Sequence, residues 1–206
     1  SRGLGDVYKR QEKIEPKDMP ELEQWVLHRL SELDERVRKG YTEYDFQGVF
    51  QSVFTFATVE LSSFYFDIRK DVLYCDGDTL ERRSARSVLD HIFVRLTAWL
   101  APVLVFTMEE VWLERYPGDE SSIHLTDMPS TPKTWLNEEL AKKWAVIRQA
   151  RRAVTAALEL QRTDKVIGSS LEASPIVYLE DQETFDILDS IPSVSYTHLR
   201  AHETSE

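Results

Sequence analysis

Apolar residues dominate one long stretch in the first half of the chain. Between Phe46 and Phe66 the only charged residue is Glu60. Apolar side chains recur there at steps of three and four, the spacing of one face of an α-helix. The residues on this face are Phe46, Phe50, Val53, Ala57, Leu61, Phe64 and Ile68. With Asp45 as a good N-cap, the pattern predicts a helix from about Asp45 to about Asp71 inside a helical bundle.

Similar spacing predicts further helices on both sides of this one. One begins near Pro20 and ends near Gly40, which we expect to be its C-terminal stop. Another runs from about Thr79 until Pro102 breaks it, and a shorter helix follows. A last long helix follows Trp135 and has apolar residues from Leu140 to Leu158 on one side. The expected inward residues of these helices are Leu22, Trp25, Val26, Leu30, Leu33, Val37, Ala85, Leu89, Ile92, Leu96, Trp99, Trp112, Leu140, Trp144, Ile147, Val154 and Leu158.

The pattern changes in two places. Residues 121–135 are rich in Ser, Thr and Pro, so we interpret them as a loop that crosses the bundle surface. After Lys165, residues 171–179 alternate as a strand does, and Asp181 is placed to cap a short helix to about Leu188. One strand cannot satisfy its own ladder groups. We therefore expect a mainly α protein, an antiparallel helical bundle followed by the start of a small truncated α/β subdomain.

The two ends of the chain differ from the middle. Residues 1–11 (SRGLGDVYKRQ) have no apolar period, and residues 194–206 (VSYTHLRAHETSE) do not continue the preceding helix. Both resemble translated library-adapter sequence, so we set them aside as suspected scars and expect the natural protein to be longer. The expected domains are then a helical domain over residues 12–165 and a truncated subdomain over residues 166–193.

Composition narrows the class of protein. The chain has 206 residues, 42% hydrophobic content and a formal net charge of −11, which argues against indiscriminate coating of nucleic acid or membrane. No apolar run reaches the roughly 18 to 20 residues that span a bilayer, so we expect a cytoplasmic protein without membrane contact. The single cysteine, Cys75, can form neither an internal disulfide nor, alone, a zinc site.

No catalytic constellation is present in the sequence. His28, His91 and His124 are scattered, and the seven glycines include no phosphate-cradling loop. His198 and His202 have the i, i+4 spacing of a helical metal site, but they fall in the suspected C-terminal scar and lack the intervening Glu. We therefore predict no catalytic residue, no metal and no cofactor within this chain.

The positive candidates are basic and aromatic side chains that could contact RNA phosphates and bases. They gather at the end of the long apolar helix, at the start of the next helix and on the last one. The candidate tRNA-binding residues are Arg69, Lys70, Tyr74, Arg82, Arg83, Arg86, Arg148, Arg151 and Arg152. Tyr41 and Tyr44 are further candidates for stacking on unpaired bases. For each arginine a solvated helix face with ion pairs stays open, and for each tyrosine so does simple packing.

Charge is unevenly distributed toward the C-terminus. Residues 142–165 contain seven basic residues against two acidic ones, a local balance of +5. Residues 172–189 contain six acids and no base. Local charge therefore favours a polyanion at the last long helix more than the total charge does.

Four segments carry a resemblance to a known family. They are Tyr44 to Phe50 (YDFQGVF), Glu60 to Asp76 (ELSSFYFDIRKDVLYCD), Leu100 to Trp112 (LAPVLVFTMEEVW) with Ser122 to Pro129 (SIHLTDMP), and Arg162 to Ala173 (RTDKVIGSSLEA). Their order and content are similar to the anticodon-binding helical domain of bacterial-type isoleucyl-tRNA synthetases, which are class I aminoacyl-tRNA synthetases. The resemblance covers about residues 18–188. The Leu-Ala-Pro and Glu-Glu-Val-Trp elements recur in valyl, leucyl and methionyl relatives, whereas the run SFYFDIRKD points to the isoleucine enzyme.

The resemblance implies a helical bundle of the class I anticodon-binding type. It also implies a parent enzyme that joins isoleucine to its tRNA at the expense of ATP. The family's ATP-binding signatures, its editing domain and its zinc-binding cysteine cluster are absent from this chain, so we expect the fragment to be inactive alone. ATP, and zinc in many members, would belong to the full-length parent. The implied partners are tRNA, in particular isoleucine tRNA, and the remainder of the synthetase, in a monomer.

Three alternatives stay open at this point. The parent could be a valyl- or leucyl-tRNA synthetase. The chain could be a free-standing RNA-binding module without an enzyme, although the severed strand argues against natural boundaries. It could also be a structural bundle that docks on a protein partner, which the acidic total charge would suit.

Overall fold

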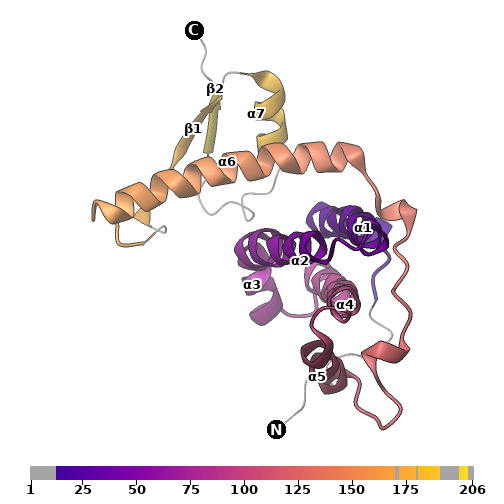
Figure 1. The fold of residues 1–206 in the computed structure, drawn as a ribbon. Coiled ribbons are helices and arrows are strands. Elements are labelled where there is room, and N and C mark those ends of the chain that lie inside the picture. The colour runs from indigo at the N-terminus through magenta and orange to yellow at the C-terminus, as the bar shows by residue number, and fades with distance from the viewer. Residues whose placement is uncertain (1–12, 170–171, 180, 191–199, 204–206) are drawn as a thin grey trace. The chain divides into compact units, whose positions relative to one another are not determined.

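The chain is mainly helical and divides into two compact units. The computed structural model describes residues 13–169, 172–179 and 181–190, together with the backbone of residues 200–203 (Figure 1). The units are residues 1–137 and 138–206, and each is described by itself. The expected fold class, mainly α, is confirmed. This division by contacts groups the last long helix with the C-terminal residues, whereas we expected the helical domain to extend to residue 165.

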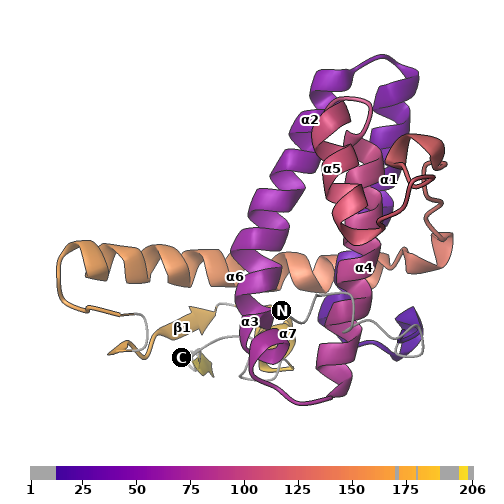
Figure 2. The same cartoon turned by 90° about the horizontal axis from the view of Figure 1, so that it is seen from below.

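The first unit is a bundle of antiparallel helices. Helix α1, the continuous run α2–η4–α3 and helix α4 lie side by side, with the α1–α2 and α3–α4 turns at opposite ends (Figure 2). The elements are η3 (Pro16–Asp18), α1 (Glu21–Thr42), α2 (Phe46–Thr55), η4 (Phe56–Phe66), α3 (Asp67–Tyr74), α4 (Leu80–Leu100), α5 (Val105–Arg115), η5 (Ile123–Leu125) and η6 (Lys133–Trp135). The four helices predicted between residues 20 and 112 are thus present in this unit.

The second unit consists of a long helix and a small parallel sheet. Its elements are α6 (Glu138–Thr163), β1 (Ile176–Leu179), α7 (Gln182–Asp189) and β2 (Arg200–Glu203). Asp181 caps α7 as predicted, because its carboxylate accepts a hydrogen bond of 2.7 Å from the backbone N–H of Thr184. The strand is shorter than the predicted 171–179.

Strand β1 has a partner within the chain. It pairs in parallel with β2, in a register that sets Ile176 opposite Arg200 and Leu179 opposite Glu203. Strand β2 comes from the stretch 194–206 that we had set aside as a suspected scar. The suspected N-terminal scar, residues 1–11, lies outside the described residues, as does most of the C-terminal one.

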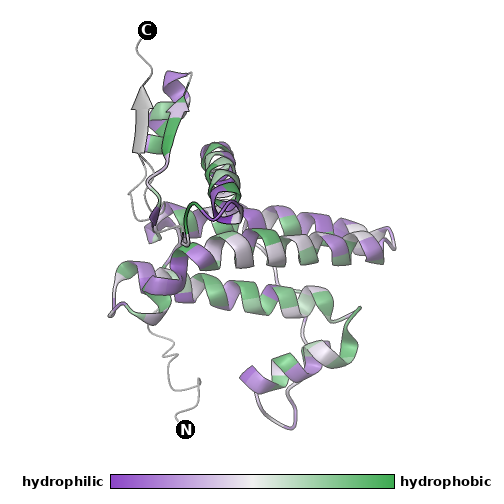
Figure 3. Cartoon of the chain, turned by 90° about the vertical axis from the view of Figure 1, so that its left-hand side faces the viewer, coloured by the Kyte–Doolittle hydropathy of each residue, from purple (hydrophilic) through white to green (hydrophobic). Residues whose placement is uncertain are grey.

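The core of the first unit forms on the predicted face of α1. The predicted inward residues Leu22, Val26, Leu30, Leu33 and Val37 are all buried. Trp25 packs edge-on against Phe64 of η4, with ring centroids 5.4 Å apart. Full burial of one such side chain stabilises the fold by about 1.5–3 kcal/mol. Figure 3 shows how apolar and polar residues interleave along the long helices.

The second predicted helix differs from the prediction in its winding. Residues 56–66 are π-helical, so the backbone hydrogen bonds run from i to i+5 and each turn takes up more residues than in an α-helix. A period of 3.6 then no longer identifies the inward face. Phe46 and Phe50, predicted to point inward, are 47% and 37% exposed. Val49, Val53 and Phe56 are buried in their place.

The α1–α2 turn also differs from the prediction. Gly40 does not end α1, which continues to Thr42. The left-handed residue that closes the helix is Tyr44, with φ of 61°. The Asp45 N–H bonds to the Gly40 carbonyl at 2.8 Å and the Tyr44 N–H to the Tyr41 carbonyl at 3.3 Å, which is a Schellman motif. Asp45 then caps α2 as predicted, accepting a 2.9 Å hydrogen bond from the Gly48 N–H.

Gly40 is required by packing between helices. A Cβ at this position would lie 2.5 Å from Cγ2 of Val49 on α2, a buried and stiff side chain. The absence of a side chain therefore lets α1 and α2 approach closely near their shared turn.

We expect Gly40→Ala to destabilise the chain by about 1–3 kcal/mol, because the overlap with Val49 outweighs the better helix propensity of alanine. Urea unfolding followed by circular dichroism measures the change. The double variant Gly40→Ala/Val49→Ala should lose less stability than the sum of the losses of the two single variants, by at least about 1 kcal/mol. Strictly additive losses would contradict the proposed overlap.

The loop over residues 121–135 is fastened to the bundle, as expected for a loop that crosses its surface. Arg95 donates to the Ser130 carbonyl at 2.7 Å and to the Thr131 hydroxyl at 3.1 Å. At the end of the loop, the ring of Trp135 lies edge-on to His91, at 4.9 Å between centroids, and 4.5 Å from the guanidinium carbon of Arg95. His91 is thus enclosed between α4 and the loop.

This enclosure makes folding stability depend on pH. Burial lowers the pKa of His91 to about 4, and the positive charges of Arg95 and Lys13 add to the effect. In the unfolded chain the histidine pKa is about 6.5, so between pH ~6.5 and ~4 only the unfolded state takes up the proton. The free energy of unfolding should therefore fall by about 2 kcal/mol over this range through His91 alone.

Urea titrations of the original chain and of His91→Gln at pH 7, 6, 5 and 4.5 measure this dependence. The variant should lack the histidine contribution and retain that of the carboxylates. Parallel pH profiles for the two proteins would show that His91 does not titrate as described.

Candidate nucleic-acid interface

The candidate RNA-binding residues fall into two groups, one on each unit. The first group lies at the α3–α4 end of the bundle and comprises Arg69, Lys70, Tyr74, Arg82, Arg83 and Arg86. The second group lies along α6 and comprises Arg148, Arg151 and Arg152. The first group occupies α3 and the first two turns of α4, and the second group occupies successive turns of α6. We therefore treat each group as a separate surface.

The α3–α4 turn is built from local signals. Helix α3 ends at Tyr74, and the short polar stretch through Gly77 reverses the chain. Thr79 then caps α4, its hydroxyl accepting a 3.2 Å hydrogen bond from the Arg82 N–H. This cap places Arg82 and Arg83 in the first turn of α4, beside the exit of α3.

Arg69 is engaged inside the bundle. Its Nε and Nη2 donate to the two carboxylate oxygens of Glu23, both at 2.7 Å, and its side chain is only 11% exposed. Tyr65 donates a third hydrogen bond to the same fully buried carboxylate, at 3.1 Å. Burial works to lower the pKa of Arg69, but the hydrogen bonds and charge of Glu23 outweigh it and raise that pKa. Burial, and then the charge of Glu23, raise the pKa of Tyr65.

Lys70 and Tyr74 are accessible to a ligand. The Lys70 side chain is 57% exposed and its ammonium lies 3.0 Å from the Asp67 carboxylate on the same helix. Tyr74 is 85% exposed at the end of α3, with its ring turned to solvent. An exposed tyrosine next to a lysine offers a stacking surface and a phosphate contact together.

The arginines of α4 already have partners nearby. Arg82 donates to the backbone carbonyl of Asp76 at 2.7 Å, while its buried Nε has no hydrogen-bond partner. Arg83 lies 3.5 Å from the Asp78 carboxylate, an ion pair without hydrogen-bond geometry. Arg86 is half-buried one turn further on. Residues 67–83 contain five acids and four bases, so a phosphate here must compete with carboxylates.

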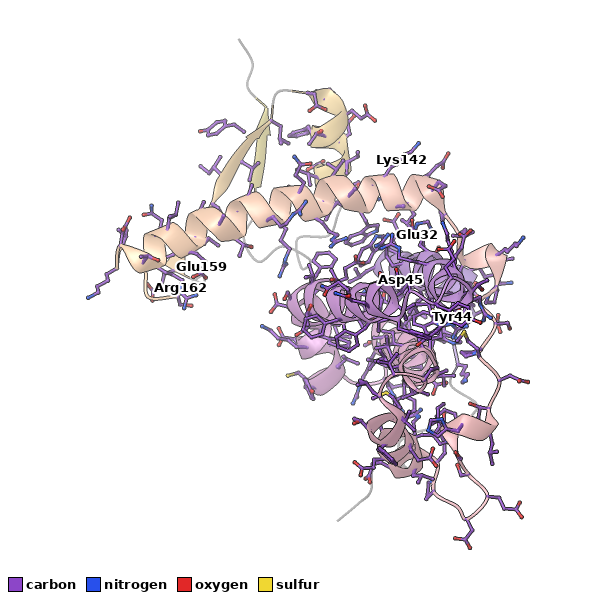
Figure 4. The ribbon with its side chains drawn as sticks, viewed as in Figure 1. Glu32, Tyr44, Asp45, Lys142, Glu159 and Arg162 are labelled. Carbon is purple, nitrogen blue, oxygen red and sulfur yellow. The ribbon has the colours of Figure 1, made fainter. Side chains whose placement is uncertain are left out.

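Helix α6 is the more basic of the two surfaces. Residues 142–152 contain five basic residues and no acid. Arg152 is exposed, whereas Arg148 and Arg151 are half-buried. Toward the end of the helix the basic charge is compensated, because Arg162 pairs with Glu159 at 2.7 Å (Figure 4). The positive charge of α6 is therefore concentrated in residues 142–152, between the acidic first turn and the compensated end of the helix; Figure 4 labels Lys142, where this run begins.

The further tyrosine candidates are placed differently from each other. Tyr44 is 79% exposed at the α1–α2 turn, where Figure 4 labels it beside Asp45. Tyr41 is half-buried and donates its hydroxyl to the backbone carbonyl of Trp99. Burial also raises the pKa of Tyr41. Tyr41 therefore packs within the bundle, and Tyr44 remains accessible.

An exposed aromatic stripe on α2 was missed by the sequence interpretation. Phe46, Phe50 and Phe54 follow one another at i, i+4 spacing and all are partly exposed, with Phe50 and Phe54 stacked at 6.0 Å. The signal was present, because α2 is apolar on two faces rather than one. The inward stripe chosen from the sequence mixed residues of both faces.

Metal and membrane sites are not evident in the described part of the chain. Within residues 13–169, 172–179 and 181–190, no group of three His, Cys, Asp or Glu side chains is arranged to hold a metal ion. The pair His198 and His202 does not form a helical site, since His202 belongs to β2 and His198 lies outside the described residues. Cys75 is exposed as a free thiol. None of the described helices is both long and apolar enough to cross a membrane.

The described chain contains a helical bundle, a basic helix and accessible tyrosines, the features expected of a helical nucleic-acid-binding domain. Comparison with known proteins narrows this broad class to one family. A family model described as the anticodon-binding domain of tRNA ligase matches residues 23–177, and the chain belongs to this family.

Curated relatives are similar over most of the chain. The isoleucine–tRNA ligase of Ruegeria pomeroyi is 64% identical over 177 residues, which are 86% of this chain and 18% of the relative. Those of Brucella abortus and Agrobacterium fabrum are 54% and 53% identical over 175 and 173 residues, 84% of this chain and 18% of each relative. The chain thus spans about a fifth of the length of these relatives. The resemblance noted in the sequence is confirmed.

The two adjacent basic residues of α3 should differ sharply in their effect on stability. Arg69→Met leaves Glu23 buried without its counter-charge and should cost about 3–5 kcal/mol. Lys70→Met is the matched control and should change stability by less than about 0.5 kcal/mol, because its ion pair is exposed. Urea unfolding of both variants tests this. A small loss for Arg69→Met would show that the buried pair is dispensable.

Proposed function

We propose that this chain is the part of an isoleucine–tRNA ligase that holds the anticodon stem and loop of its tRNA. The observation that supports this most is the family match over residues 23–177, together with relatives named isoleucine–tRNA ligase at 50–64% identity. These relatives also favour an isoleucine enzyme over the valyl and leucyl alternatives.

The proposed division of labour follows from the charges and the aromatic residues. Basic side chains of α6 would contact phosphates, which position the RNA without reading its sequence. Exposed rings such as Tyr74 and Tyr44 would stack on unpaired loop bases. The candidate arginines and Lys70 remain candidates for the phosphate contacts, with Arg69 the least accessible of them because it is bound to Glu23.

The activity of the whole enzyme is part of the same proposal. The parent would attach isoleucine to its tRNA with ATP, in the cytoplasm and as a monomer. ATP and any zinc would be bound by regions outside this chain, and the chain alone would not aminoacylate. No step of that chemistry is assigned to the residues described above.

Titration of the chain with fluorescently labelled isoleucine tRNA, monitored by anisotropy across a salt series, tests the proposal. We expect tighter binding to the native anticodon than to the same tRNA with an altered anticodon. Arg152→Gln should reduce the slope of log affinity against log salt by about 1, as expected for one lost phosphate contact. Tyr74→Ala should weaken binding about 5- to 150-fold if the ring stacks on a base.

Matched controls separate specific contacts from loss of charge or surface area. Arg162→Gln removes the same charge from the compensated end of α6 and should leave the salt slope nearly unchanged. Tyr178→Ala removes another exposed ring, 67% exposed against 85% for Tyr74, from β1 and should leave the affinity unchanged. Equal, salt-steep binding of both tRNAs would reduce the function to backbone contacts. No binding by a well-folded chain would favour the docking-bundle alternative.

A further inference from the structure

The aromatic stripe of α2 has a geometry suited to flat ligands. Phe46, Phe50 and Phe54 occupy successive turns and are 47%, 37% and 52% exposed. The rings of Phe50 and Phe54 are nearly parallel, with an angle of 20° between their planes. From Phe46 to Phe54 the stripe follows the helix for about 12 Å. That length accommodates about three bases at the roughly 3.4 Å spacing of a stacked nucleic-acid strand.

A second stripe, made of uncharged polar residues, runs beside the rings. Gln47, Gln51 and Thr55 each follow one of the phenylalanines by one position, so they lie about 100° further around the helix, and all three are exposed. Gln51 donates a hydrogen bond from its Nε2 to the Thr55 hydroxyl at 3.3 Å. Amide and hydroxyl groups both donate and accept hydrogen bonds, which is what the edges of unpaired bases require. Helix α2 therefore combines a stacking surface with a polar stripe that can contact base edges.

The aromatic stripe continues into the α1–α2 turn. The ring of Tyr44, which Figure 4 labels, lies edge-on to the ring of Phe46, with centroids 6.3 Å apart. Tyr44 is itself one of the exposed rings proposed to stack on loop bases. The stripe thus extends that surface from the turn along the helix.

The absence of charge along α2 distinguishes bases from phosphates as the ligand. No charged residue occurs between Phe46 and Val59, so the stripe offers no contact for a phosphate. A duplex, which presents mainly its phosphate backbone, is disfavoured on such a surface. Unpaired bases suit it, because every base has a face that can stack on an aromatic ring. The match of residues 23–177 to an anticodon-binding family favours RNA over a protein as the partner.

We infer that the aromatic stripe of α2, together with Tyr44, is the surface on which unpaired bases of the anticodon loop stack. The rings hold the faces of the bases, the polar stripe contacts their edges, and basic side chains elsewhere hold the phosphates. This assignment rests on the proposed function and refines it. The α1–α2 and α3–α4 turns lie at opposite ends of the bundle (Figure 2), so a loop on α2 lies nearer Tyr44 than Tyr74.

Titration of the 206-residue chain with labelled isoleucine tRNA across a salt series tests the assignment. Phe54→Ala should weaken binding about 5- to 150-fold and leave the slope of log affinity against log salt unchanged, because a stacked ring releases no counterions. Phe54→Leu keeps an apolar side chain but lacks an aromatic face, and should lose about as much affinity. Phe106→Ala is the matched control, since it removes an exposed ring from α5, and should bind like the original chain. Circular dichroism checks that each variant is folded.

The outcomes separate this assignment from the proposed function. If both Phe54 variants bind as the original chain does, with the preference for the native anticodon intact, the stacking surface is overturned and the proposed function stands. The stripe would then be left to a protein partner. Full affinity of Phe54→Leu alone would also overturn stacking, because apolar area would suffice. A folded chain that binds no tRNA would overturn both.

Photo-crosslinking provides a second readout that does not depend on affinity. 5-Iodouridine, which forms photoproducts with aromatic rings that stack on it, replaces one base of the anticodon loop at a time. At least one loop position should crosslink to the aromatic stripe, as identified by mass spectrometry of the digest. The same probe in the anticodon stem is the control and should not reach the stripe. Loop crosslinks confined to Tyr74, or to any surface other than α2 and Tyr44, would overturn the assignment.

Discussion

Two buried carboxylate–arginine pairs hold the first unit together across helices distant in sequence. Glu23 of α1 binds Arg69 of α3 through two hydrogen bonds, and Glu60 of η4 binds Arg29 of α1 at 2.8 and 2.9 Å. A buried carboxylate without its counter-charge costs several kcal/mol. Rotation or sliding of α1 relative to η4 and α3 would break these pairs and is therefore unfavourable. Apolar packing alone would accept several arrangements of the same stripes. The two pairs select one of them.

The pairs also give a physical account of the π-helical winding. Glu23 and Arg29 are six positions apart on α1, which is about 9 Å along an α-helix. Their partners Arg69 and Glu60 are nine positions apart on the run η4–α3, which packs against α1. Nine residues of regular α-helix would extend about 13.5 Å. Turns closed by i to i+5 hydrogen bonds accommodate more residues each and so reduce this mismatch. The lower rise of the π-helical turns thus fits the spacing of the two ion pairs.

What the sequence predicts well here is local. The N-caps at Asp45 and Asp181 and the buried stripe of α1 depend on neighbours within one or two helical turns, and all are as predicted. The left-handed Tyr44 and the π-helical stretch depend on how helices meet, which no local spacing records. The candidate site shows the same division: the basic run of α6 is visible in sequence, but the engagement of Arg69 is not, because its partner lies 46 positions away.

The π-helical stretch has a consequence for insertions and deletions in this chain. Substitutions between Glu60 and Arg69 change one side chain each and leave the spacing of the two ion pairs intact. Loss or gain of a single codon there would turn everything downstream by about 100° around the helix axis, unless the winding itself were rebuilt. The number of residues between Glu60 and Arg69 is therefore constrained separately from the identity of those residues.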